Sequence, residues 1–139
     1  MAEEKLAYEL ISPERLLARG EADMVVVPGE QGDFGVLPLH APLVALLRPG
    51  VIRIFDGQTV VDRLFVAGGF AEVSERGLTV LAEAAEPVAE ITLEEARRRL
   101  REAEEDLAIA KEPSEAERER LERAIAIARA RLEAVEHPT

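Results

Sequence analysis

The chain has 139 residues, which is enough for one or two small folded units. It carries a formal net charge of −11, from 17 basic and 28 acidic side chains, and so acidic a chain would repel nucleic acid and anionic lipid. The sequence contains no cysteine and no run of 18 apolar residues, which excludes disulfides, thiolate chemistry and direct insertion into a membrane.

The first 85 or so residues contain short apolar or alternating stretches, several of them rich in Val and Ile. Gly, Pro and Asp separate these stretches, as at Pro28-Gly29, Asp56-Gly57 and Arg76-Gly77. The predicted strands are Lys5–Ile11, Arg15–Arg19, Asp23–Val27, Asp33–Leu37, Leu43–Leu47, Val51–Phe55, Thr59–Val66, Phe70–Val73 and Leu78–Ala82. Many short strands at close spacing predict an antiparallel β-sandwich or flattened barrel over residues 1–88.

After Pro87 the apolar period changes to that of a helix. Thr92 and Glu95 form a capping box, in which the threonine hydroxyl accepts from the Glu95 amide and the glutamate reaches back. A narrow apolar seam follows at steps of three and four, made by Leu93, Ala96, Leu100, Ala103, Leu107 and Ala110. Pro113 then stops the helix.

A second helix is predicted after Ser114, which forms another capping box with Glu117. Its seam consists of Leu121, Ile125, Ala128, Leu132 and Val135. Two helices with a short loop and two narrow seams predict an antiparallel two-helix hairpin over residues 89–139, so the fold class is α+β. Because the seams are mainly Leu and Ala, the hairpin buries little apolar surface, and we expect it to detach or open at modest cost.

No arrangement of residues typical of an active site is found. The chain has two histidines, His40 and His137, and no nucleophile elbow, metal-ligand cluster or phosphate-binding loop. Gly68-Gly69 lies between two predicted strands and indicates a turn or bulge. His40, in a turn between strands, is either a structural histidine or a contact residue on a loop.

The predicted helices are crowded with arginine, and two interpretations stay open. Glu–Arg pairs on a solvated face would each contribute about 0.2–0.5 kcal/mol, whereas a basic surface would meet an acidic partner or a nucleotide. The arginines concerned are Arg97, Arg98, Arg99 and Arg101, then Arg118, Arg120, Arg123, Arg129 and Arg131.

Residues 25–42, VVVPGEQGDFGVLPLHAP, resemble the signature segment of the epsilon family of F-type ATP synthases. Pro49-Gly50, residues 66–73 and residues 78–81 resemble later family segments in the expected order and spacing. One departure is Leu39, where the family commonly has Gly or Asn before the histidine. The resemblance covers nearly the whole chain, and the helical hairpin that follows the sandwich agrees with it.

The resemblance implies a non-catalytic central-stalk subunit of a proton-translocating ATP synthase, which couples rotation to catalysis. It places the sandwich on the gamma subunit and the c-ring, with Glu30, Gln31 and Asp33 facing the c-ring and His40 facing gamma. It also implies that the hairpin inhibits ATP hydrolysis by meeting the catalytic alpha and beta subunits. Arg123, Arg129 and Arg131 are the expected contacts. With a polar start and no membrane span, the chain is expected at the cytoplasmic face of the bacterial inner membrane, held there by the complex.

Two other hypotheses remain beside the rotor subunit. Some bacterial members bind ATP through Ile/Leu-Asp-x-x-Arg-Ala at the start of the first helix, and Leu93–Arg98 matches this motif at Leu93 and Arg97. Glu94 replaces the aspartate and Arg98 replaces the alanine, so an ATP-sensing site at Glu94 and Arg97 is an alternative, and weak or absent ATP binding is expected. The third hypothesis is an unrelated adaptor with a coiled-coil arm.

Overall fold

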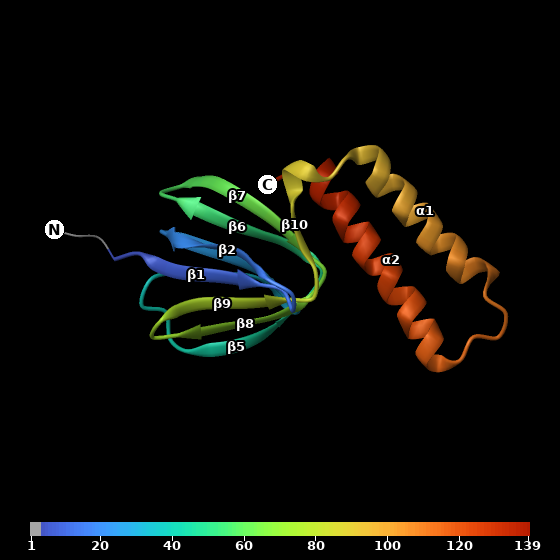
Figure 1. The fold of residues 1–139 in the computed structure, drawn as a ribbon, viewed down its shortest axis with the longest axis horizontal. Coiled ribbons are helices and arrows are strands. Elements are labelled where there is room, and N and C mark those ends of the chain that lie inside the picture. The colour runs from blue at the N-terminus through green and yellow to red at the C-terminus, as the bar shows by residue number, and fades with distance from the viewer. Residues whose placement is uncertain (1–3) are drawn as a thin grey trace. The chain divides into compact units, whose positions relative to one another are not determined.

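A computed structural model describes residues 4–139. The chain divides after Pro87 into two compact units, the first built of strands and the second of helices (Figure 1). The expected α+β class is therefore confirmed, with a β-sandwich followed by two packed helices. Neither of the two α-helices has the length and apolar character that a membrane crossing would need, within residues 4–139.

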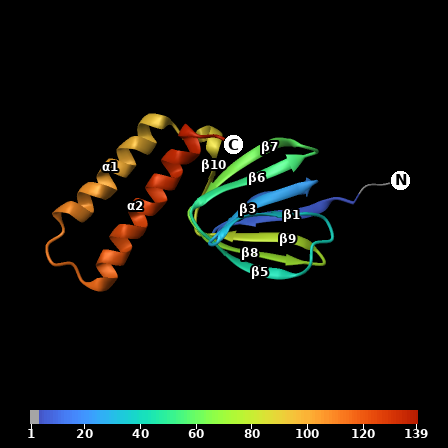
Figure 2. The same cartoon turned by 180° about the vertical axis from the view of Figure 1, so that it is seen from behind.

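The ten strands of the first unit form one sheet, folded over on itself into a sandwich that is nearly a closed barrel (Figures 1 and 2). They are β1 Leu6–Ile11, β2 Leu16–Ala22, β3 Met24–Gly29, β4 Gly32–Val36, β5 Leu43–Leu47, β6 Gly50–Asp56, β7 Thr59–Val66, β8 Gly69–Ser74, β9 Gly77–Ala82 and β10 Ala85–Pro87. The order is β10-β7-β6-β3-β5-β8-β9-β1-β2, and β4 pairs with β3 outside this path. All pairs are antiparallel except β1 with β9.

Alternate residues of the strands build the core, as the period of two requires. Leu10, Val25, Ile52 and Val80 are fully buried, and each belongs to a different strand. Most of this core is branched and aliphatic, and residues of both layers belong to one buried cluster.

The two layers are joined at a corner where β3 leaves β6 and reaches β5. β3 pairs with β6 through residues 24–26 and with β5 at a single position, Gly29 opposite Leu47. The amide of Arg48 donates to the Pro28 carbonyl and the amide of Glu30 donates to the Leu46 carbonyl, both at 2.9 Å. Because β4 has β3 as its one partner among the described strands, it forms a sheet edge beside this corner.

The second unit begins with a short 3₁₀ turn, η1 Val88–Glu90, and contains α1 Leu93–Ile109 and α2 Glu115–Glu136. Both predicted N-caps are present: Thr92 Oγ1 accepts from the Glu95 amide at 3.2 Å, and Ser114 Oγ accepts from the Glu117 amide at 3.1 Å. Glu112, just before Pro113, has a φ of 45° and turns the chain between the helices.

The interface between α1 and α2 is thin, as the seams predict. The buried apolar residues of the two helices are Ala96, Leu121, Ala128 and Ala134, and three of these four are alanines. The other seam positions are half-buried or exposed. The hairpin therefore has a small apolar core of its own.

Candidate functional site

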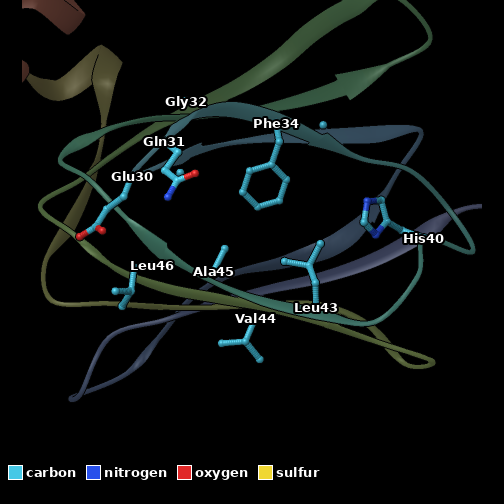
Figure 3. A pocket seen from close by; sticks show the side chains of 11 residues that line it. Glu30, Gln31, Gly32, Phe34, His40, Leu43, Val44, Ala45 and Leu46 are labelled. Atoms are coloured by element: carbon cyan, nitrogen blue, oxygen red, sulfur yellow. The ribbon is translucent and has the colours of Figure 1, made fainter.

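A groove of about 640 Å³ lies between β4 and β5 at the corner of the sandwich (Figure 3). Figure 3 shows the Phe34 ring projecting between the two strands, with His40 at one end of the groove and Glu30 and Gln31 at the other. The lining residues are Gly29, Glu30, Gln31, Gly32, Phe34, Gly35, His40, Leu43, Val44, Ala45 and Leu46. Three residues predicted from the sequence as partner contacts thus surround one groove.

Glu30 and Gln31 form the two-residue turn of the β3–β4 hairpin, and both are exposed. Asp33, the third residue predicted for this loop, is held in place on the hairpin by ion pairs. Its carboxylate accepts from Arg48 Nη2 at 2.6 Å and from Arg53 Nη2 at 3.4 Å. Arg48 also donates to the Gly29 carbonyl, so these contacts fix the turn while leaving the Glu30 and Gln31 side chains accessible.

His40 lies in the loop between β4 and β5, as predicted. Its Nδ1 is 2.7 Å from the Ala41 carbonyl oxygen, and since a carbonyl only accepts, Nδ1 carries the proton of that bond. Leu39 precedes it with a φ of 65°, in the left-handed region, and its side chain is 85% exposed. Glycine or asparagine would suit that backbone better than leucine does.

A row of exposed apolar side chains crosses β5, β8 and β9. Leu46 lies opposite Phe70, and Phe70 lies opposite Leu81. Leu46 is 60% exposed and Val44, on the same strand, is 68% exposed. The sequence analysis did not single out this row, although Leu43–Leu47 is apolar at every position, which is typical of a strand covered on both faces.

In the helical unit, an ion pair joins α1 to α2. Arg131 Nη2 donates to Glu95 Oε1 at 2.5 Å, and the arginine side chain is 7% exposed. This hydrogen bond from Arg131 is the main reason why the pKa of Glu95 lies below its ordinary value. The Glu95 carboxylate, expected to reach back to its own helix cap, therefore serves the contact between the helices.

The other two arginines predicted as contacts differ from Arg131 in exposure. Arg129 is 62% exposed, and its Nη2 lies 3.6 Å from Glu104 Oε2 on α1. Arg123 is exposed on α2. The hairpin therefore presents Arg123 and Arg129 outward, whereas Arg131 can meet a partner only after its pair with Glu95 breaks.

Glu94 and Arg97, the residues of the possible ATP site, stand in the first turns of α1. Glu94 is exposed, and Arg97 Nη2 lies 3.8 Å from Glu136 Oε2 on α2. Arg98 pairs with Glu102 at 3.5 Å. Among residues 4–139, no group of three or more acidic, histidine or cysteine side chains is arranged to hold a metal ion.

Comparison with known proteins gives consistent similarities. Residues 5–88 match the family model described as "ATP synthase, Delta/Epsilon chain, beta-sandwich domain". The chain is 56% identical to the ATP synthase epsilon chain of Paramagnetospirillum magneticum over 108 residues, which are 78% of this chain and 81% of that one. It is 50% identical to the ATP synthase epsilon chain of Rhodospirillum rubrum over 131 residues, covering 94% and 96% of the two chains.

The fold is also similar to solved structures. A chain of the Euglena gracilis mitochondrial ATP synthase superposes with a TM-score of 0.79 at 27% identity, over 97% of this chain and 83% of that one. A chain from Tetrahymena thermophila superposes with a TM-score of 0.67 at 14% identity, over 97% and 99% of the two chains, which shows the shared fold alone.

Proposed function

The chain belongs to the ATP synthase delta/epsilon family, as a member with the sequence of a bacterial epsilon chain, and on this premise we propose how its two units act. Epsilon is a non-catalytic subunit of the central stalk of F-type ATP synthase, and membership of the family excludes the unrelated adaptor. The chain lies at the cytoplasmic face of the bacterial inner membrane, held there by the complex, and proton transport is the coupled process.

The sandwich docks on the gamma subunit through the apolar row on β5, β8 and β9. The supporting observation is that Leu46, Phe70 and Leu81 are adjacent across three strands and remain exposed on an otherwise acidic chain. His40, at the end of the groove beside β5, belongs to the same contact. The hairpin turn with Glu30, Gln31 and Asp33 faces the c-ring; the similar Euglena gracilis chain was solved in an assembly that includes a c-ring.

Placing a charge in the row tests the gamma contact. Val44→Asp puts a carboxylate into the proposed interface, and Val61→Asp, on β7, is the matched control because Val61 is also exposed, at 58%. Titration calorimetry with gamma is expected to show at least tenfold weaker binding for Val44→Asp and no change for Val61→Asp. Equal binding by both variants would remove the row from the interface.

The hairpin inhibits ATP hydrolysis by leaving its folded state and meeting the acidic surface of the catalytic alpha and beta subunits. The observation that supports this is the thin interface between its helices. That interface buries three alanines, one leucine and the side chain of Arg131, which pairs with Glu95. Opening it breaks the Glu95–Arg131 pair and adds Arg131 to the basic surface of Arg123 and Arg129. Opposite charges across such an interface attract, and salt screens the attraction.

An ATPase assay of the reconstituted catalytic complex tests the inhibition. Deleting residues 89–139 should raise hydrolysis and leave assembly intact. Replacing Arg123 and Arg129 by Ala should reproduce part of the rise, with a smaller effect at high salt. If neither the truncation nor the substitutions change hydrolysis, the hairpin is passive and only the stalk role remains.

A further inference from the structure

The sheet edge that β4 exposes to the groove carries main-chain groups that point away from β3. The Pro28 carbonyl accepts from Arg48 on the β5 side, so Pro28 and its β4 partner Asp33 form a non-hydrogen-bonded pair. By the alternation of antiparallel ladders, Asp33 and Gly35 both direct N–H and C=O towards the open edge. Gly35 lines the groove.

β5 presents an open edge to the same groove. The Leu46 carbonyl accepts from the Glu30 amide, which shows that the main-chain groups of Leu46 face β3 and the groove. Val44, two residues earlier, has the same orientation, since alternate residues of a strand bond to the same side. The opposite edge of β5 is fully paired with β8 over residues 43–47.

β4 lacks the features that protect natural sheet edges. It contains no lysine and no proline, and its register with β3 runs from Gly29–Gly32 to Val25–Val36 without a bulge. Its one charged side chain, Asp33, is paired with Arg48 and Arg53, so its charge does not repel a strand that approaches the open edge. An unprotected edge facing a cavity of about 640 Å³ is suited to pairing with a further strand.

We propose that the groove between β4 and β5 receives an extended strand of the gamma subunit, which pairs by main-chain hydrogen bonds with the edges at Gly35 and Val44. This rests on the proposed docking to gamma. The groove is continuous with that interface, because Val44 and Leu46 belong both to the groove lining and to the exposed strand of the apolar row. The strand adds a sheet ladder to what would otherwise be a contact of side chains alone.

The lining specifies the chemistry of the incoming strand. Phe34 and Leu43 are apolar and lie between the two edges, so the inward side chains of the strand are apolar (Figure 3). Glu30 carries the one formal charge among the described lining residues, so a lysine or arginine belongs at that end of the strand. Main-chain pairing supplies affinity, and these side-chain positions supply specificity.

Two measurements with purified gamma test the strand. In wild type, hydrogen exchange followed by NMR should show the Gly35 and Val44 amides slowed at least tenfold on binding.

Val44→Pro removes a donor at the groove edge and leaves the β8 ladder intact, and Val44→Ala is its control because it shortens the side chain and keeps the amide. Calorimetry should show about tenfold weaker binding for Val44→Pro than for Val44→Ala.

The outcomes separate this inference from the proposed docking. If wild type binds gamma and the two amides exchange as fast as in the free chain, the strand is wrong and the docking stands. If those amides are slowed by the isolated c-ring and not by gamma, the occupant is wrong. If wild type does not bind gamma at all, the docking and the strand both fail. The exchange measurement on wild type decides the matter even if Val44→Pro does not fold.

Discussion

At the scale of single residues, Leu39 shows how a departure from the family pattern acquires a physical meaning. The sequence marks the position as unusual, and the structure supplies the reason, a φ of 65°. Left-handed backbone costs an ordinary L-residue about 1–2 kcal/mol, and less for Asn. The sequence alone could not give this value, because the backbone angle depends on the loop that closes β4 onto β5.

Leu39→Asn is expected to stabilise the sandwich by about 0.5–1 kcal/mol, since asparagine tolerates the left-handed region. Urea unfolding measures the gain as a higher midpoint at unchanged slope. Leu37→Asn is the control, because Leu37 is 53% exposed in the same loop and does not have a positive φ. A gain of the same size at Leu37 would show that the effect comes from lost surface apolarity.

Gly69 shows a stricter demand, which the sequence indicates only as a turn or bulge. Its φ is 136°, and a Cβ there would lie 2.0 Å from the Leu81 carbonyl oxygen on β9. Gly69→Ala should therefore destabilise the sandwich by more than about 4 kcal/mol. Gly57→Ala should cost about 1 kcal/mol, because Gly57 has a φ of 63° and nothing within 4 Å. Urea unfolding of both variants compares the two, and equal costs would contradict the steric argument.

At the scale of elements, local patterns predicted more than long-range ones. Both capping boxes place the helix starts correctly, because a cap depends on residues three positions apart. β10 was missed, since Ala85–Pro87 is three residues long and lacks β-branched side chains. The Glu95–Arg131 pair was also missed, because the crowded arginines and glutamates offer many pairings and the register between the helices decides which of them form.

The Glu95–Arg131 pair makes the hairpin sensitive to acid. The pKa of Glu95 is lowered in the folded state by its hydrogen bond from Arg131. The pair therefore stabilises the hairpin above the unfolded carboxyl value of about 4.3 and loses this effect as the pH falls through the folded value. The melting temperature of the helices, followed by circular dichroism, should fall less on acidification in Glu95→Gln than in wild type.

Glu94→Gln is the matched control for this acid sensitivity, because Glu94 is the exposed neighbour in the same helical turn. It should keep the wild-type pH dependence of melting. A Glu95→Gln variant that melts with the same pH dependence as wild type would show that other carboxylates control the hairpin.

The first turn of α1 is expected to bind ATP weakly or not at all. Glu94 is one methylene longer than the aspartate of the motif, and Arg98 puts a bulky cation where the motif has alanine. The Arg97 guanidinium also lies beside Glu136. Calorimetry with ATP in the absence of magnesium should detect no micromolar binding to wild type. Restoring the family motif with Glu94→Asp and Arg98→Ala should strengthen binding. Micromolar binding by wild type would overturn the expectation.

At the scale of the whole molecule, the sequence pattern indicates where strands give way to helices. Apolar residues recur every second position before Pro87 and every third or fourth position after it, and the elements change at the same place. The groove between β4 and β5 was not predictable, although three of its residues were singled out. Strand patterns do not reveal which edges meet, and here that depends on the single pairing of Gly29 with Leu47.

A fragment of residues 1–88 is expected to fold alone and to bind gamma. The buried aliphatic cluster of the sandwich is contributed by residues of the first unit. The fragment should unfold in urea at the midpoint of the sandwich in the full chain, and gel filtration with gamma should show a complex. A folded fragment that does not bind would assign part of the gamma contact to the helices.

The parallel pairing of β1 with β9 also governs the order in which a newly made chain can fold. Tyr8 must wait for Leu78, its partner in the ladder, to be synthesised. At translation rates of about 5–20 residues per second, that wait lasts roughly 4 to 14 s. Until then the edge of β1 that later pairs with β9 has no neighbour, so nascent chains are most exposed to misassociation during that interval. Slower translation before residue 78 would lengthen it.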